Sequence, residues 1–133
     1  MLTVSDVRAA VAWYTEVLGF VEHVRIGAGH RAQLGLPDGP PAELVVAEVR
    51  PGRRTPEGET SHQVMLKVAD AAKVVEAAVA RQARLVDPLH DWEYGERQAI
   101  IVDPFGHQWV LNQTLTDVAP EEWGGETVVP RPA

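Results

Sequence analysis

An internal repeat divides the chain into two halves of similar design. The segment LTVSD at residues 2–6 returns 64 positions later as LKVAD at residues 66–70. Each copy leads into a segment whose apolar residues recur every three or four positions, the spacing of a helix with one buried face. Asp6 and Asp70 stand where a helix needs an N-cap, because a carboxylate accepts hydrogen bonds from the first unpaired N–H groups. The repeat therefore predicts two equivalent strand–helix units.

Three segments after each predicted helix are typical of strands. They are residues 20–26, 31–36 and 43–49 in the first half, and residues 85–86, 97–102 and 108–112 in the second. The turn sequences PDG at 37–39 and DPFG at 103–106 separate the last two strands of each half. Asp, Pro and Gly occupy the positions that a type I turn prefers, so we expect a structural role for Asp103.

The two predicted helices end in different ways. Gly19 follows the first helix and can adopt the left-handed conformation that ends a helix at little cost. The second helix ends near Gln82 and Ala83 without a glycine, which predicts backbone strain there. On the first helix, Trp13 and Tyr14 are expected to pack against the sheet.

The repeat predicts a single α+β domain, residues 1–118, made of two βαβββ modules. The modules are residues 1–49 and 62–118, joined by a linker rich in Pro and Gly at 50–61. Neither half, at about 60 residues, is large enough to be comfortably stable alone. Residues 119–133 are expected to form an extended tail. Its Trp123 should dock on the body of the protein or on a neighbouring subunit, because a free exposed indole gains nothing.

Charge and hydropathy narrow the choice of partners. Twelve basic residues against 19 acidic ones give a net charge of −7, which disfavours nucleic acid as a partner. No apolar run approaches the roughly 20 residues that span a bilayer, and the N-terminus lacks a signal-peptide pattern. The chain has no cysteine. We therefore expect a cytoplasmic protein without a membrane partner.

Several motifs resemble those of the vicinal oxygen chelate superfamily, which groups glyoxalase I, bleomycin-resistance proteins and extradiol dioxygenases. They are LTVSD at 2–6, WYTEVLGF at 13–20, YGER at 94–97, DPFGHQWVL at 103–111 and DVAPEEW at 117–123. The resemblance is nearest to bleomycin-resistance-like and metal-free binding members. It implies cupped mixed sheets, a homodimer in which modules pair, and a ligand cleft inside the curved sheets. Because the superfamily contains isomerases, dioxygenases, thiol transferases and drug-sequestering proteins, the fold does not assign the function.

The resemblance also implies where a metal ion would bind. Enzymes of the superfamily place His and Glu ligands near the starts of strands 1 and 5 and within strands 4 and 8. Here the corresponding residues are Gln63 in strand 5, Val45 near strand 4 and Val110 in strand 8, while the position in strand 1 would precede Met1. Relatives usually carry several more residues before LTVSD, so the first strand is expected to be short. We therefore expect no metal cofactor.

A residual metal pair remains as an alternative. His62 and Glu48 could bind one divalent metal ion if the strand register were shifted by one residue. The simpler interpretation is that both are polar residues facing water.

Aromatic residues supply the positive argument for a ligand. Trp92 and Tyr94, with His90 beside them, fall in a predicted loop before strand 7, where planar side chains can stack on a planar ligand. Arg97 can pair with an anionic ligand or with a neighbouring carboxylate, and the second is the simpler expectation. The candidate ligand-binding residues are therefore Trp92, Tyr94, His90, Val45, Val110, Gln63 and Arg97.

Three functions fit these observations. The leading hypothesis is a metal-independent protein that sequesters an aromatic or amphipathic antibiotic and so confers resistance. The first alternative is a metal-dependent lyase, isomerase or dioxygenase of the glyoxalase group, using His62 and Glu48. The second is an accessory protein whose dimer surface matters and whose cleft is vestigial. No cysteine nucleophile, Gly-rich phosphate loop or Ser-His-Asp arrangement supports covalent catalysis.

Overall fold

Two modules with the same order of elements make up the fold, in a computed structural model that describes residues 1–38, 44–58 and 60–128. The first module contains β1 (Leu2–Val4), α1 (Val7–Leu18), β2 (Val21–Ile26), β3 (Arg31–Gly35) and β4 (Leu44–Glu48). The second contains β5 (Val64–Lys67), α2 (Ala71–Ala80), β6 (Arg84–Asp91), β7 (Glu96–Val102) and β8 (Gln108–Thr114). A 3₁₀ turn, η1 (Pro120–Trp123), follows in the tail. Glu43, Gly39 and the last five residues of the predicted tail lie outside the described residues.

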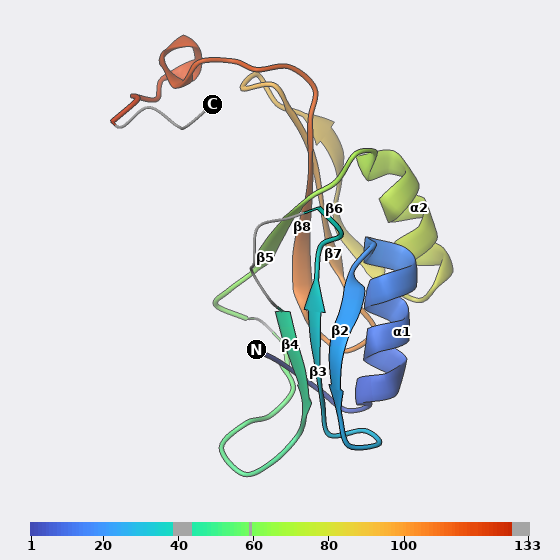
Figure 1. Cartoon of the computed structure of the whole chain (residues 1–133). Helices are drawn as coiled ribbons and strands as arrows, with labels where there is room; N and C mark the ends of the chain where they lie inside the picture. Colours follow the sequence, from blue (N-terminus) through green and yellow to red (C-terminus); the bar gives the residue numbers. More distant parts are fainter. Residues whose placement is uncertain (39–43, 59, 129–133) are drawn as a thin grey trace.

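Each module forms one mixed four-stranded sheet. The strand orders are β1-β4-β3-β2 and β5-β8-β7-β6, with the first pair of each sheet parallel and the other pairs antiparallel. Both helices lie on the same side of the molecule, with α1 over the first sheet and α2 over the second (Figure 1). The predicted α+β fold of two βαβββ modules is confirmed.

The helix ends agree with the prediction. Asp6 Oδ1 accepts a hydrogen bond from Ala9 N at 3.0 Å, and Asp70 Oδ1 accepts one from Lys73 N at 3.1 Å. Gly19 ends α1 with a φ of 84°. After α2, Gln82 has a φ of 73°, the only non-glycine residue with a positive φ in the described part of the chain. The backbone strain predicted at the end of α2 is therefore present.

The second half contains a longer strand than predicted. β6 runs over Arg84–Asp91 instead of residues 85–86, so that His90 lies in a strand and not in a loop. Asp and Pro are disfavoured inside sheets, which hid this strand from sequence analysis. The structure accommodates Pro88 because β6 is an edge strand whose register with β7 shifts at two places.

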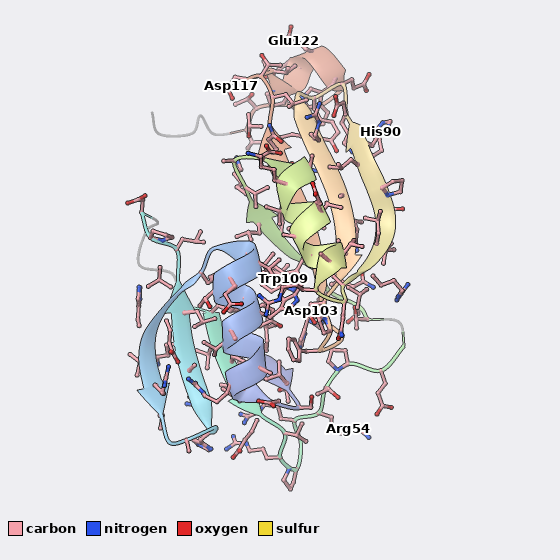
Figure 2. All side chains as sticks on the ribbon, turned by 90° about the vertical axis from the view of Figure 1, so that its right-hand side faces the viewer. Arg54, His90, Asp103, Trp109, Asp117 and Glu122 are labelled. Atoms are coloured by element: carbon pink, nitrogen blue, oxygen red, sulfur yellow. The ribbon has the colours of Figure 1, made fainter. Side chains whose placement is uncertain are left out.

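Asp103 joins the two modules through a set of buried hydrogen bonds. Its Oδ2 accepts from Tyr14 Oη of α1 at 2.6 Å and from Trp109 Nε1 at 2.9 Å. Its Oδ1 accepts from Phe105 N at 2.8 Å and His107 N at 3.0 Å within its own turn. The carboxylate lies with Trp109 at the junction of the modules (Figure 2). These bonds give Asp103 the structural role expected from its turn.

Two further contacts cross the junction. Trp13 Nε1 donates to Arg81 O at 2.9 Å, which ties α1 to the end of α2. His107 Nε2 lies 2.8 Å from Thr3 O of β1. Trp13 and Tyr14 are both buried, as expected for residues between helix and sheet. The halves therefore share one interior.

The tail is only partly extended. After β8 the chain crosses to the side of the second sheet away from the helices, where Pro120–Trp123 form the 3₁₀ turn (Figure 1). Among the described residues, neither helix is long and apolar enough to span a membrane.

Candidate ligand-binding site

Strand alternation gives the second sheet one covered face and one open face, the open face being the one opposite α2. Trp109 and Leu111 of β8 belong to the core on the covered face, where the Trp109 ring lies 5.4 Å from that of Tyr14. Val110 alternates with them and pairs with Met65 and Ile100. Trp109 therefore packs on the helix side of the sheet, while Val110 faces the other way.

Four aromatic side chains form a continuous row at the end of this sheet. His90 lies edge-on to Trp92 at 4.4 Å, and Trp92 stacks on Tyr94 at 5.8 Å with 9° between the ring planes. Tyr94 in turn contacts Trp123 of the tail at 5.2 Å. Trp92 and Trp123 remain 45% and 40% exposed. This aromatic row, from His90 to Trp123, therefore offers ring surface to a ligand.

Gly95 holds the turn that carries Trp92 and Tyr94. It has a φ of 84°, and a Cβ atom there would lie 2.2 Å from Thr116 O. The same close approach lets Gly95 O accept hydrogen bonds from Leu115 N and Thr116 N at 2.8 and 3.3 Å. Only glycine fits this position, because the turn must touch the chain as it leaves β8.

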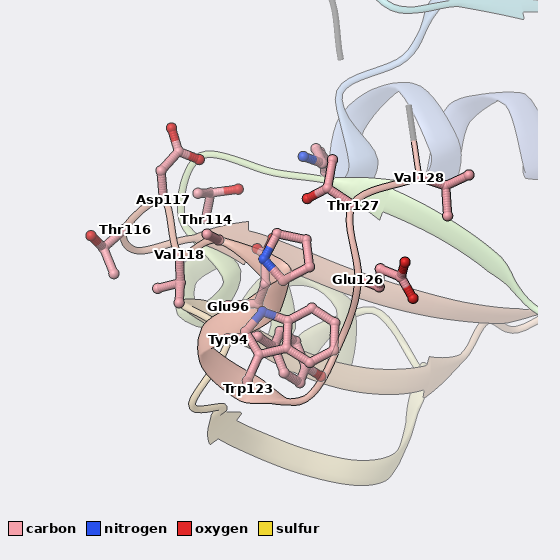
Figure 3. A pocket seen from close by; sticks show the side chains of 13 residues that line it. Tyr94, Glu96, Thr114, Thr116, Asp117, Val118, Trp123, Glu126, Thr127 and Val128 are labelled. Atoms are coloured by element: carbon pink, nitrogen blue, oxygen red, sulfur yellow. The ribbon is translucent and has the colours of Figure 1, made fainter. Parts of the chain in front are cut away.

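Two hollows flank the aromatic row on the open face. The edge hollow has a volume of about 320 Å³ and is lined by Asp87, Pro88, His90, Trp92, Gln98, Ala99 and Ile100. The tail hollow has a volume of about 630 Å³ and lies between the sheet and the tail (Figure 3). Tyr94, Glu96 and Trp123 line it, with residues of β5, β8 and the tail. The stacked Trp92–Tyr94 pair contributes one ring to each hollow.

The residues at the superfamily's metal positions do not suit a metal ion. Val45 and Val110 have no donor atom, and Gln63 Nε2 donates a hydrogen bond to Gln108 Oε1 at 2.9 Å. Within the part of the chain that the structure describes, no three His, Asp or Glu side chains are grouped so that they could hold a metal ion.

The two residues of the residual metal pair, Glu48 and His62, have different contacts. Glu48 Oε1 contacts His30 Nδ1 at 2.7 Å. His62 lines a separate hollow between the modules, of about 340 Å³, together with Thr3, Arg54 and His107.

Arg97 lies away from the aromatic row. It alternates with Glu96 and Gln98 along β7, so its side chain belongs to the opposite face. Its guanidinium donates from Nε to Asp91 Oδ1 at 2.6 Å and from Nη2 to Asp91 Oδ2 at 3.0 Å. Hydrogen bonding to Arg97 lowers the pKa of Asp91. The simpler expectation, pairing with a neighbouring carboxylate, is confirmed.

Three residues of the open face belong to none of the candidate sites predicted from the sequence, namely Glu96, Gln98 and Asn112. Glu96 Oε2 and Asn112 Oδ1 are both buried without a hydrogen-bond partner among the described residues, and Asn112 is only 3% exposed. Gln98 Oε1 accepts from Tyr94 Oη at 3.3 Å. Burial, with Glu96 as a second cause, raises the pKa of Tyr94. Counting every second residue from Tyr94 along β7 would have found Glu96 and Gln98.

Comparison with known proteins agrees with the fold. A family model for the Glyoxalase/Bleomycin resistance protein/Dioxygenase superfamily matches residues 1–111. TioX from Micromonospora sp. ML1 has a solved structure that is 30% identical, with a TM-score of 0.66, covering 86% of this chain and 94% of TioX. A glyoxalase family protein from Bacillus cereus is 18% identical with a TM-score of 0.71, covering 86% and 91% of the two chains, which supports the fold alone.

A mycobacterial protein is similar to this chain to a comparable degree. An uncharacterized protein of Mycobacterium tuberculosis (strain H37Rv) is 27% identical over 140 residues, covering 91% of this chain and 76% of that protein. The family match spans far more than half of the sequence, and the strand order agrees with it. The chain therefore belongs to the glyoxalase/bleomycin resistance protein/dioxygenase superfamily.

Proposed function

We propose that this protein binds an aromatic or amphipathic small molecule on the open face of its second sheet without a metal ion, and that it protects against an antibiotic by sequestering it. The observation that carries this proposal is the aromatic row. Two of its rings, Trp92 and Trp123, stay substantially exposed although each is held in place by a neighbouring ring.

The hollows beside the row suit a small organic guest. Ligand pockets are typically about 300–1,000 Å³ and combine apolar walls with a few polar groups that orient the ligand. The edge hollow offers the Trp92 ring and Ile100 as apolar surface, with Gln98 and His90 as polar groups. Planar rings bind planar ligands with little loss of conformational entropy, because aromatic side chains have only two rotatable bonds.

The identity of the side chains argues for binding rather than metal-assisted catalysis. A valine in β4 and a valine in β8 replace the carboxylates that an enzyme of this superfamily would use. The best residual donor, Glu48, already has His30 as its partner. Asp103 and Tyr14 are committed to holding the modules together.

A second copy of this chain is the protein partner we propose. Exposed apolar side chains follow one edge strand of each sheet, namely Val21, Val24 and Ile26 of β2 and Leu85, Val86 and Leu89 of β6. Burying such residues against a second copy would remove apolar area from water. The family resemblance described above implies the same partner.

Titration of tryptophan fluorescence tests the binding proposal. We expect quenching by a neutral planar probe such as 2-naphthol and by one or more aromatic antibiotics. Trp92→Ala should weaken binding about tenfold, since stacking on one ring contributes about 1–3 kcal/mol. Val79→Ala, an exposed apolar substitution on α2, is the matched control and should bind normally. Equal affinity in Trp92→Ala and the parent protein would contradict the proposed site.

Metal content completes this test. Protein purified without chelator should contain far less than one equivalent of Fe, Mn, Ni or Zn. A near-stoichiometric amount of one metal that is lost in His62→Ala would instead support the metal-dependent alternative.

A further inference from the structure

The tail that encloses the tail hollow is held by its own acidic side chains. Glu122 Oε2 accepts a hydrogen bond from Ala119 N at 3.0 Å, which caps the 3₁₀ turn. The Glu121 carboxylate accepts from Thr127 N at 3.1 Å and from Thr127 Oγ1 at 3.2 Å. These bonds lower the pKa of Glu121. Two of the tail's carboxylates are therefore used to shape the chain over the sheet.

Other carboxylates line the hollow itself. Glu96 rises from β7, while Asp117 follows β8 and Glu126 lies on the tail (Figure 3). Lys67 is the one basic side chain among the residues that line it. Three carboxylates against one ammonium leave the lining with an excess of negative charge. No salt bridge joins Lys67 to any of the three within the described ranges.

Glu96 is the unusual member of this group. Its Oε2 is buried and has no hydrogen-bond partner among the described residues. A carboxylate oxygen that has lost water without gaining a donor is unfavourable, so such an atom marks a place where a donor or a cation is missing.

The aromatic walls of the tail hollow favour a cation, as its carboxylates do. Tyr94 and Trp123 meet at 5.2 Å with their planes tilted by 52°, so that the two rings form a corner beside Glu96. The faces of aromatic rings attract cations through their quadrupole, and Trp is the strongest of them. An anionic ligand would instead meet three carboxylates.

We propose that the tail hollow binds a positively charged group, an ammonium or guanidinium carried by the aromatic ligand, with Glu96 as its ion partner and Tyr94 and Trp123 as its aromatic faces. This inference rests on the proposed function and specifies the class of ligand: a cationic aromatic molecule whose planar part reaches toward Trp92. The tail is then part of the site, because it supplies Trp123 and one of the three carboxylates, Glu126.

The test uses the full-length protein labelled with ¹⁵N and two probes of opposite charge. Benzyltrimethylammonium should shift the indole N–H signal of Trp123 in a saturable way, and added salt should weaken its binding because charge attraction is screened. Benzoate, which carries the same ring with a negative charge, should leave that signal in place. Stronger binding of benzoate than of the cation would overturn the proposal.

Two variants test whether the Glu96 carboxylate is responsible for binding the cation. Glu96→Gln should weaken binding of benzyltrimethylammonium about tenfold, as expected for loss of a charge-assisted contact. Glu93→Gln, which removes the same charge from the same turn but does not line the hollow, should bind as the parent does. Equal losses in both variants would overturn the assignment. If Glu96→Gln fails to fold, Trp123→Ala, at an exposed position, should bind benzyltrimethylammonium about tenfold more weakly. Because this variant has lost the indole signal, its affinity is measured by calorimetry, and an unchanged affinity would overturn the proposal.

The outcomes separate this inference from the proposed function. If 2-naphthol quenches the tryptophan fluorescence in a way that Trp92→Ala weakens, while benzyltrimethylammonium does not move the Trp123 signal, the cation site is wrong and the binding function stands. If neither probe nor any aromatic antibiotic binds, both are wrong.

Discussion

At the scale of single residues, Asp103 and Tyr14 matter most to the interior. One carboxylate satisfies four donors, of which only Tyr14 Oη comes from the other module. The turn sequence DPFG predicted a structural aspartate, but it could not identify Tyr14 as its partner. The two residues are 89 positions apart, and sequence spacing carries no information about such a contact.

The first prediction concerns alkaline pH. Burial, followed by the charge of Asp103 and the hydrogen bond to it, raises the pKa of Tyr14 far above its ordinary value. The unfolded chain therefore loses this proton first, and stability that is complete below pH 10 falls as the pH rises further. Between pH 10 and 11 the free energy of unfolding should drop by about 1 kcal/mol on account of this group.

Urea unfolding of the parent protein and Tyr14→Phe at pH 8 to 11 checks this prediction. At pH 8 the variant should be less stable by about 1–3 kcal/mol, because Asp103 loses a donor. The difference in the free energy of unfolding should narrow above pH 10. There Tyr14 ionises in the unfolded parent and lowers the parent's stability, whereas the phenylalanine variant has no such group. A difference that stays constant over the whole range would show that Tyr14 has no raised pKa.

A second prediction follows from the backbone at Gln82. This residue ends α2 in the left-handed region, with Ala83 N donating to Ala78 O and Gln82 N donating to Val79 O. Gln82→Gly should stabilise the protein by about 0.5–1 kcal/mol, since glycine has no Cβ to strain there. Gln82→Ala keeps the Cβ and should give no such gain. The measurement is the free energy of unfolding in urea.

At the scale of elements, hydrophobic patterning located both helices and most strands, and it failed at β6. Asp87 and Pro88 interrupt the apolar pattern of that strand, and every residue of β6 is exposed. An edge strand needs neither a buried face nor an uninterrupted ladder, so periodicity could not reveal it. The consequence reached the site, because His90 was assigned to a loop although it lies in β6.

At the scale of the whole molecule, the repeat and the motifs were sufficient to predict the architecture and the family. They also identified Trp92 and Tyr94, which lie side by side in the structure. They could not show that the tail returns over the open face, since that depends on the contact of Gly95 with Thr116 and of Trp123 with Tyr94. About half of the residues that line the tail hollow therefore could not be predicted from motifs in the two modules.

The hydrogen bond between Tyr14 and Asp103 makes the junction asymmetric, because the first module supplies the donor and the second the acceptor. In the repeat, Ala78 occupies the place of Tyr14, and a methyl group has nothing to donate. Two copies of the first half could not rebuild this contact, nor could two copies of the second. Domain swapping, in which two complete chains exchange halves, would restore this contact. Such a dimer would therefore keep all the hydrogen bonds between the modules.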